Sequence, residues 1–236
     1  MIIRWLFLLM LIGSLVACGA DDPPALPPEE IVQATADHLN QLDGFHFIIE
    51  RTGAPAFLDL DGLIAFRRAE GDYTAPDKAR AVVRVIVPGL VTEVNVISIG
   101  AVQWQTNVVT GAWEELPPHW GFNPAALFDP TIGLPTILQN ELSELELVGL
   151  EPLEGVTTDS VYRLTAVVAG DSIYQMSGTL IGPDPVTAEF WINPVTFDPI
   201  RILVTEPVPD SDEPSLWQVD FSQLGQAVAI EAPSTD

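Results

Sequence analysis

The sequence predicts an α+β fold in which one curved antiparallel sheet dominates and two or three short helices pack against it. Three observations support this class. Apolar and polar residues alternate in ten short segments, as in strands with one covered face. Helical spacing of apolar residues is found in residues 29–42 and again after Pro135. The 21 prolines and 17 glycines favour turns over long helices.

The first predicted element is an amphipathic helix over residues 29–42. Its apolar or small residues recur at close to helical spacing, two glutamates lie in its first turn, and Gly44 follows its end. Such a helix packs one stripe of side chains against the rest of the protein. The apolar run after Pro135, which ends at Leu142, predicts a second and shorter helix.

From residue 45 onward the pattern changes to a period of two residues. Strands are predicted where such a segment is bounded by Gly, Pro, Asn or Asp. In the clearest segment, Val102, Trp104 and Val108 share one face, which we expect to be the covered face. The predicted strands are 45–50, 62–68, 80–87, 91–99, 102–108, 161–169, 172–180, 187–192, 200–206 and 216–222.

The number of predicted strands raises the question of what covers them. Ten strands of about six residues present a broad apolar face that two or three short helices cannot cover completely. The sheet therefore either closes on itself or encloses an apolar interior of the kind that binds apolar ligands. Periodicity alone gives equal support to a β-sandwich with a filled core, so the residue pattern leaves both alternatives open.

The composition excludes several classes of protein. With 9 basic and 33 acidic residues the formal net charge is −24, which argues against a nucleic-acid-binding surface. Hydrophobic residues make up 47% of the chain, enough for a folded core and too many for a disordered protein. The single cysteine excludes an internal disulfide framework and any site with several cysteine ligands.

Residues 1–17 have the organisation of an export signal peptide, with a basic residue at Arg4 and an apolar stretch that is too short to span a membrane. Leu15-Val16-Ala17-Cys18 resembles the bacterial lipobox, which implies that Cys18 is acylated and becomes the N-terminus after cleavage. The alternative is a secretory signal without a lipid and a fortuitous cysteine. Because the single cysteine lies at the cleavage point, we favour the lipid anchor.

Residues 18–28 then form a proline-rich tether, with prolines at positions 23, 24, 27 and 28. This composition disfavours helix and sheet and predicts an extended spacer. We expect residues 29–236 to form one domain, held at the extracytoplasmic side of the cell membrane by the N-terminal lipid. No later stretch is long and apolar enough to suggest a transmembrane helix.

A series of different short motifs is distributed along nearly the whole mature chain. They are the lipobox cysteine, Leu-Asp-Gly-Phe-His-Phe at 42–47, Gly71-Asp72-Tyr73, Pro76-Asp77-Lys78-Ala79, Gly111-Ala112-Trp113, Asn123-Pro124, Leu127, Gly133-Leu134, Glu189-Phe190-Trp191-Ile192-Asn193-Pro194, Pro199-Ile200-Arg201, and Phe221-Ser222 through Ile230 and Pro233. Each motif alone is a turn or a buried aromatic residue. In this order they resemble the LppX/LprAFG lipoprotein family, relatives of the LolA and LolB lipoprotein carriers.

The resemblance implies a half-open barrel, in which a strongly bent antiparallel sheet has helices on its concave side around a large apolar cavity. It also implies non-covalent binding of a lipid or lipidated glycan by its acyl chains and carriage across the cell envelope, with an envelope lipid transporter as a partner. We expect a monomer without cofactor or metal. The alternative is a structural or interaction lipoprotein with a filled core and no ligand.

Apolar residues of the predicted elements are candidates for lining the cavity, although each has burial in an ordinary core as its alternative role. Arg67 and Arg68 belong to a concentration of basic residues between 51 and 84 and are candidates for contact with an anionic head group. Pairing with nearby acids such as Glu50 and Glu70 is their alternative role. The cavity candidates are Val102, Trp104, Val108, Leu134, Ile137, Leu138, Phe190 and Ile192.

Catalytic signatures are missing from the sequence. The three histidines, His38, His46 and His119, are not at metal-ligand spacing. Neither a Gly-x-Ser-x-Gly motif nor a phosphate-binding glycine loop occurs. The acidic trio at 210–213 lacks the glycine and distal glutamate of an EF-hand loop, so we interpret it as a solvated turn. We expect that the protein is not an enzyme.

Overall fold

The computed structural model describes residues 26–59, 61–117, 123–209 and 211–235. The predicted signal peptide, Cys18 and most of the predicted tether lie outside these residues, as do His119 and Asp210. Within the described part, eleven strands form one sheet, accompanied by three α-helices and a short 3-10 helix. No helix in that part is long and apolar enough to cross a membrane.

The elements follow one another as two blocks of strands with helices before, between and within them. The helices are α1 (Pro28–Leu39), η1 (Ala126–Phe128), α2 (Leu134–Asn140) and α3 (Gly170–Met176). The first block of strands is β1 (Gly44–Gly53), β2 (Ala65–Thr74), β3 (Lys78–Val87), β4 (Leu90–Ile99), β5 (Val102–Thr106) and β6 (Trp113–Glu115). The second block is β7 (Leu142–Pro152), β8 (Ser160–Val168), β9 (Val186–Ile192), β10 (Pro199–Glu206) and β11 (Ser215–Ser222).

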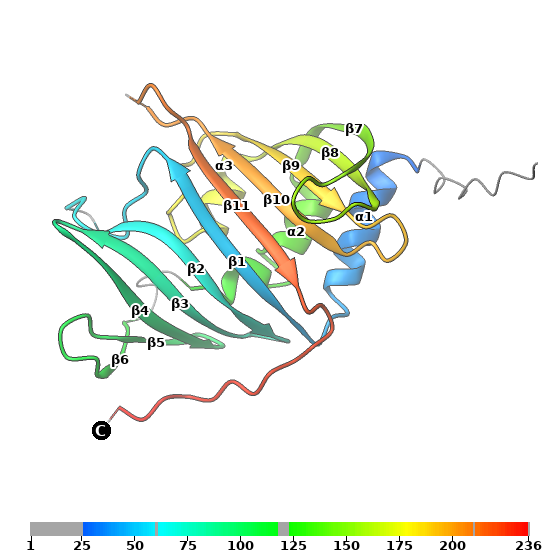
Figure 1. Cartoon of the computed structure of the whole chain (residues 1–236). Helices are drawn as coiled ribbons and strands as arrows, with labels where there is room; N and C mark the ends of the chain where they lie inside the picture. Colours follow the sequence, from blue (N-terminus) through cyan, green and yellow to red (C-terminus); the bar gives the residue numbers. More distant parts are fainter. Residues whose placement is uncertain (1–25, 60, 118–122, 210, 236) are drawn as a thin grey trace, which may run out of the picture.

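The sheet is antiparallel throughout, with the strand order β6-β5-β4-β3-β2-β1-β11-β10-β9-β8-β7 (Figure 1). β1 pairs with β11, so the first and last strands join an N-terminal half, β1 to β6, to a C-terminal half, β7 to β11. The terminal strands β6 and β7 do not pair with each other, so the sheet stays open. The predicted class, an open antiparallel sheet with a few helices, is confirmed.

Helix α1 begins at Pro28, which has no N–H to leave unpaired, and the two glutamates of its first turn stabilise the positive end of the helix. Its buried stripe includes Ile31, Ala36 and Leu39. α1 packs against α2 and, less extensively, against β7. The helix ends at Leu39, before the predicted end at residue 42, and Asn40 is its C-cap.

Helix α3 corrects the prediction of a strand over residues 172–180. Ile173 and Met176 are three residues apart, which places both on the helix face toward the cavity described below. The first residue of the helix, at position 170, has to be a glycine, because a Cβ there would lie 2.0 Å from the carbonyl oxygen of Pro183. Alternation over so short a segment does not distinguish a two-turn helix from a strand.

Strand β7 is absent from the predicted strands, whereas the predicted helix after Pro135 corresponds to α2. β7 lies at one edge of the sheet and shifts its register against β8 twice, between Ser143 and Glu146 and between Leu147 and Gly149. Each bulge interrupts the alternation of side chains, so the period of two holds only over residues 144–147 and is not sustained along the strand. β6 has three residues, too few for a periodic pattern.

The predicted covered face of β5 is wrong. In the pairing of β4 with β5, Gln103 is opposite Ser98, which is 0% exposed, and Gln103 itself is 8% exposed. Val102 is 38% exposed, and Trp104 shares its side of the strand. The period of two was predicted correctly. The pairing with β4 decides which of the two sets of side chains is covered, and alternation alone does not contain that information.

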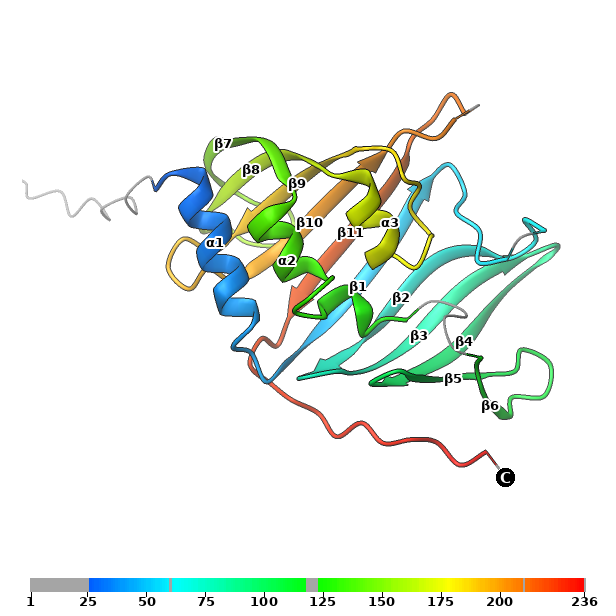
Figure 2. The same ribbon diagram turned by 180° about the vertical axis from the view of Figure 1, so that it is seen from behind.

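One face of the sheet, called here the inner face, carries the main core, including Phe45, Phe47 and Ile49 of β1. Figure 2 shows that α1, α2 and α3 lie over this face at the C-terminal half and near β1, whereas β3 to β6 extend beyond the helices. The opposite, outer face of β1 to β4 carries many charged side chains, because residues between the buried ones point outward. The helices therefore enclose space mainly over one half of the sheet.

Candidate functional site

An apolar cavity of about 80 Å³ lies between the inner face of the sheet and the helices. Its floor comes from β1 and β8 to β11, and its cover from η1, α2, α3 and the connection between α3 and β9. The lining residues are Ile49, Leu127, Phe128, Leu134, Ile137, Val168, Ile173, Met176, Ser177, Leu180, Ile181, Ala188, Phe190, Ile202, Val204, Trp217, Val219 and Phe221.

The lining contains a single hydroxyl among the described residues, that of Ser177. Its Oγ donates to the carbonyl oxygen of Tyr174 at 3.3 Å and accepts from the backbone N–H of Ile181 at 3.1 Å. The hydroxyl is therefore already satisfied within the protein. A cavity with such a lining offers water few partners and favours an apolar occupant.

An aromatic cluster closes one end of the cavity. Phe128 of η1 lies in its middle, with ring centroids 4.7 Å from Phe45, 5.3 Å from Phe47, 5.4 Å from Tyr73 and 6.1 Å from Phe221. Three of these pairs have the edge-to-face geometry that aromatic rings prefer. Because η1 precedes α2 directly, Phe128 fastens the start of the helical cover to the sheet.

Tyr73 supplies the polar atom of this cluster. Its hydroxyl donates to the carbonyl oxygen of Pro76 at 2.7 Å. Burial, together with the negative charges of Asp129 and Asp77, raises the pKa of Tyr73 to about 12. The phenol therefore stays neutral at physiological pH, and the aromatic end of the cavity carries no charge on Tyr73.

Trp217 marks the other end of the cavity, four residues before Phe221 on β11. Its indole Nε1 donates to Glu206 Oε2 at 3.0 Å, and the backbone N–H of Gly182 donates to Glu206 Oε1 at 2.7 Å. Glu206 is 9% exposed. Its carboxylate thus ties the connection between α3 and β9, which is part of the cover, to β10 and β11.

A buried arginine accompanies Trp217 at this polar end. Arg51 is opposite Trp217 in the register of β1 and β11 and is 4% exposed. Its guanidinium donates to backbone carbonyl oxygens of β2 and of the end of β1. Burial and then the positive charge of Arg67 lower the pKa of Arg51, while the charge of Glu206 acts in the opposite direction. The two ends of the cavity therefore differ, because two charged side chains, Arg51 and Glu206, lie behind Trp217 and outside the lining, whereas aromatic rings bound the other end.

The predicted cavity residues fall into three groups. The first group lines the cavity and consists of Leu134, Ile137 and Phe190. The second is buried in the same core without lining the cavity and consists of Leu138 and Ile192. The third lies outside the cavity, on or just after β5 in the N-terminal half, and consists of Val102, Trp104 and Val108. These residues do not reach the cavity because β5 lies four strands from β1, beyond the part of the sheet that lines it, and because Val102 and Trp104 face away from the covered side of β5.

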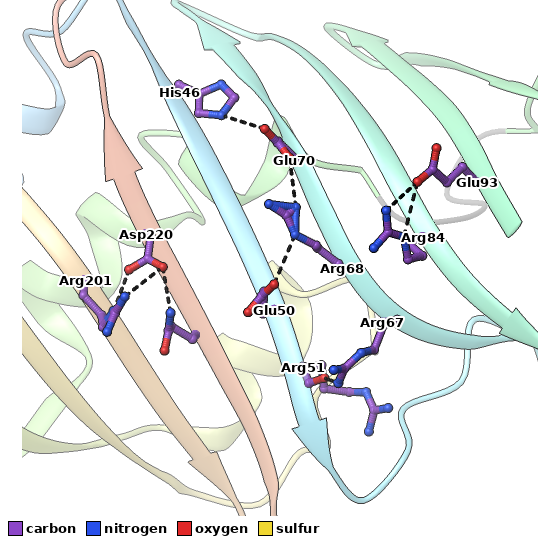
Figure 3. A network of polar contacts seen from close by, with 11 residues as sticks. His46, Glu50, Arg51, Arg67, Arg68, Glu70, Arg84, Glu93, Arg201 and Asp220 are labelled. Atoms are coloured by element: carbon purple, nitrogen blue, oxygen red, sulfur yellow. Dashed lines mark hydrogen bonds and ion pairs between the residues drawn. The ribbon is translucent and has the colours of Figure 1, made fainter. Parts of the chain in front are cut away.

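The two predicted head-group residues lie in different surroundings. Arg68 is on the outer face, where it donates to Glu50 at 3.1 Å and to Glu70 at 2.9 Å (Figure 3). Arg67 falls in a register shift of β2 against β3, so it leaves the alternation of the strand. Its exposed side chain donates to the carbonyl oxygen of Arg51. Arg67 therefore lies beside the polar end of the cavity, whereas Arg68 is engaged in surface ion pairs.

Sequence reasoning missed most of the lining residues. The alternation in β10 and β11 was recognised, and it places Ile202, Val204 and Trp217 on covered faces. The missing information was the pairing of β1 with β11, which brings Ile49 beside them across most of the chain length. The residues of α3 were missed because that segment was predicted as a strand.

Two solved structures have the same fold. LprF from Mycobacterium bovis superposes with a TM-score of 0.66 at 15% identity, covering 90% of this chain and 100% of that chain. The lipoprotein LppX from Mycobacterium tuberculosis superposes with a TM-score of 0.60 at 15% identity, covering 86% and 98% respectively. At such identities the likeness concerns the fold. No curated protein matches this chain in sequence.

The family model supplies the evidence from sequence. The model described as LppX_LprAFG lipoprotein matches residues 27–230, which is most of the chain. The match includes every helix and strand of the structure. It confirms the resemblance that the short motifs indicated. The chain therefore belongs to the LppX_LprAFG lipoprotein family.

Proposed function

We propose that this protein is a membrane-anchored, extracytoplasmic lipoprotein that binds the acyl chains of a lipid or glycolipid in its interior cavity and carries them across the cell envelope. The observation that supports this function is the apolar lining of the cavity in a chain of this lipoprotein family. An acyl chain that moves from a bilayer into such a cavity exchanges one apolar environment for another and avoids water. Modest affinity is enough for this task, and no catalytic group is needed.

The volume of the cavity limits how loading occurs. About 80 Å³ is well below the roughly 300–1,000 Å³ of pockets that enclose drug-sized ligands. An acyl chain can therefore enter only if the cover moves away from the sheet. The cover is made of short pieces, three residues in η1 and seven each in α2 and α3, and Met176 is an adaptable side chain within it. We propose that these pieces move outward as the cavity fills.

Arg67 is the head-group contact that we propose, at the polar end of the cavity. Its exposed guanidinium donates through Nη1 to the carbonyl oxygen of Arg51, and its remaining N–H groups would bind an anionic group at this end of the cavity, while Arg68 provides a matched control on the outer face. Arg67→Gln should lower loading with an anionic phospholipid severalfold, whereas Arg68→Gln should leave it unchanged. Equal loading of both variants would contradict the role of Arg67 and leave the cavity proposal in place.

The main test is photo-crosslinking of the full-length protein in vesicles that contain a palmitate with a photoactivatable diazirine group. Crosslinks are expected on the peptides that contain Met176 and Phe190. Ala188→Leu fills the cavity and should reduce these crosslinks at least fivefold, whereas Thr187→Leu adds the same side chain at the exposed neighbouring position of β9. Crosslinks that avoid the cavity peptides in the wild-type protein would refute lipid binding there.

The second candidate is a structural or interaction lipoprotein whose core binds no ligand, and the small volume of the cavity favours it. The two functions differ in what the protein carries when it is purified from its native membrane. A carrier is expected to bring lipid in addition to its own anchor, which mass spectrometry under non-denaturing conditions detects. A scaffold is expected to bring the anchor alone.

Acylation of Cys18 is part of the same proposal. Cys18→Ser should abolish incorporation of an alkyne-labelled fatty acid into the protein and release the protein from the membrane fraction. The expected change is large because two acyl chains hold a protein on a bilayer far more firmly than one does. A variant that stays labelled and membrane-bound would contradict the anchor.

A further inference from the structure

A second hollow lies on the face of the sheet opposite the cavity. It is an open groove of about 590 Å³ on the outer face of β1 to β4, bordered by Trp113 of β6. Phe45 and Phe47 of β1 face inward, so His46 between them faces outward into the groove. Because the sheet separates the groove from the apolar cavity, the two hollows are independent.

The groove presents both hydrogen-bond donors and hydrogen-bond acceptors along its length. Arg80 donates through Nε to Asp72 at 2.8 Å, and no other described residue accepts from its two terminal nitrogens. Glu93 accepts from Arg84 through Oε1 at 2.8 Å, and in the described part of the chain its Oε2 has no donor. Oδ1 of Asn95, a residue in the middle of β4, likewise has no hydrogen-bond donor among the described residues. These atoms retain their capacity to bind a ligand.

The groove also contains a flat apolar surface, the indole of Trp113, which is half-buried. Trp113 is opposite Thr106 in the pairing of β5 with β6. The hydroxyl of Thr106 accepts from the backbone N–H of Asn95 at 2.9 Å, so the indole is held close to the amide on β4. Figure 3 shows polar and charged side chains that extend from this region across β1 to β4, including His46, Glu70 and Glu93.

We propose that this groove binds a stretch of neutral polysaccharide. Sugar hydroxyl groups both donate and accept, so successive sugars match the terminal N–H groups of Arg80 and, further along β4, the free oxygens of Asn95 and Glu93. The C–H face of a pyranose ring stacks on the open face of an indole, which half-buried Trp113 offers at the border of the groove.

Other ligands fit this groove less well. An anion would meet Asp72 and Glu93, a cation would meet Arg80, and an acyl chain would leave all of these groups without partners. The sugar of a lipid held in the cavity would have to pass through the sheet to reach the groove. The ligand is therefore a free polysaccharide, and this site goes beyond the proposed lipid function.

The test uses full-length protein in a polyoxyethylene detergent, which has no sugar head group, and isothermal titration with four probes: maltohexaose, cellohexaose, mannohexaose and chitohexaose. At least one probe should bind saturably. Its affinity should change less than twofold between 50 and 500 mM NaCl because the ligand is neutral. Absence of binding for all four probes overturns the proposal, as does tighter binding of spermine or of a hexagalacturonate.

Variants assign the binding to the groove. Trp113→Ala should weaken the affinity at least tenfold, and Trp113→Phe, which keeps a flat ring and the edge strand, should retain most of it. Trp104→Ala removes an indole from the neighbouring β5 outside the groove and should bind like the wild type. Equal losses in Trp113→Ala and Trp104→Ala would refute the site. Ala188→Leu, which fills the cavity on the inner face, should leave saccharide binding unchanged.

Discussion

The outer faces of the two halves of the sheet differ in how deeply their tryptophans are buried. In the C-terminal half, Trp191 is 8% exposed, packs with Leu153 and Val161 and lies 5.7 Å below the guanidinium of Arg163. In the N-terminal half, Trp113 is half-buried and borders an open groove among charged side chains. The inner faces differ as well, because the helices cover the C-terminal half and β3 to β6 extend beyond them (Figure 2).

The comparison teaches that the course of the chain over the sheet gives the two halves different surroundings. The connection from β6 to β7 carries η1 and α2 over the inner face, and α3 lies between β8 and β9. α1, which precedes the sheet, packs against α2. Helices that cover the inner face incompletely leave an apolar cavity over the C-terminal half, whereas the inner face of β3 to β6 extends beyond them (Figure 2).

The largest effect is expected where the cover of the C-terminal half is fastened to the sheet. Phe128→Ala removes the ring at the centre of the aromatic cluster and should lower the free energy of unfolding by about 3–5 kcal/mol. Phe57→Ala, at a position that is 44% exposed, should cost less than about 1 kcal/mol. Urea denaturation measures both. Equal losses would mean that Phe128 does not hold the cover.

The polar end of the cavity tests the same cover. Glu206→Gln replaces a buried carboxylate that accepts from Trp217 and Gly182, and it should lower the free energy of unfolding by about 1.5–3 kcal/mol. Hydrogen exchange should rise in the connection between α3 and β9. Glu189→Gln, at an ion pair with Arg163 on the outer face, should cost less than about 1 kcal/mol. Unchanged exchange in the connection would argue against its attachment through Glu206.

Alkaline pH should weaken the aromatic end. Because folding raises the pKa of Tyr73 to about 12, folding favours the neutral phenol. The unfolded tyrosine ionises at about pH 10. Below that pH the contribution of Tyr73 to the free energy of unfolding is fully present, and it is lost as the pH rises through about 12. Stability should therefore fall by about 1–2 kcal/mol over this window, as urea titrations at several pH values would measure. Tyr73→Phe should flatten this decline, whereas Tyr174→Phe, at a position that is 36% exposed, should not.

The smallest effect is expected on the outer face of the N-terminal half. Burial acts to raise the pKa of Asp72, but hydrogen bonds from His46 and Arg80 and their charges outweigh it and lower the pKa. The resulting stabilisation is present above about pH 4 and is lost as the pH falls through the lower pKa of the folded state. Asp72→Asn should cost about 0.5–1 kcal/mol at pH 7, because solvent screens the half-exposed Arg80.

The dependence of stability on pH below neutrality, called here the acid limb, tests whether Asp72 contributes in this way. Urea denaturation at pH 7 and at pH 3 should show a smaller difference for Asp72→Asn than for the wild type. Glu93→Gln removes a carboxylate from the more exposed pair with Arg84 and serves as the control. An unchanged acid limb in Asp72→Asn would mean that this carboxylate does not contribute to it.

Much of the fold could be predicted from local patterns, and the failures have identifiable causes. α1 and most of the strands were found because each has a sustained period and clear boundaries, and α2, which also has only seven residues, was found because Pro135 marks its start. α3 was wrong because seven residues are too few to separate the two periods, and β7 was missed because two bulges break its alternation. β5 was correct in position and reversed in face, since the burial of Gln103 depends on its partner Ser98.

The cavity was predicted in kind and only partly in detail. Leu134 and Ile137 line it because an amphipathic segment between two blocks of strands had to cover the sheet. Trp217, Glu206 and Arg51 were not foreseen as a group, because they belong to three strands that meet through the pairing of β1 with β11 and of β10 with β11. No local pattern reports a pairing between strands that are so far apart in the chain.

The sequence by itself determined the elements with sustained periodicity, the acidic charge and the membership of a lipoprotein family, because each of these is written in local order or composition. The tertiary structure alone decided which face of each strand is covered, which side chains meet around the cavity and how small that cavity is. It also decided that a groove lined by both polar and apolar side chains lies on the opposite face. The physical reason is that strand register and helix placement depend on contacts between distant segments, and these contacts are settled by packing of the whole chain.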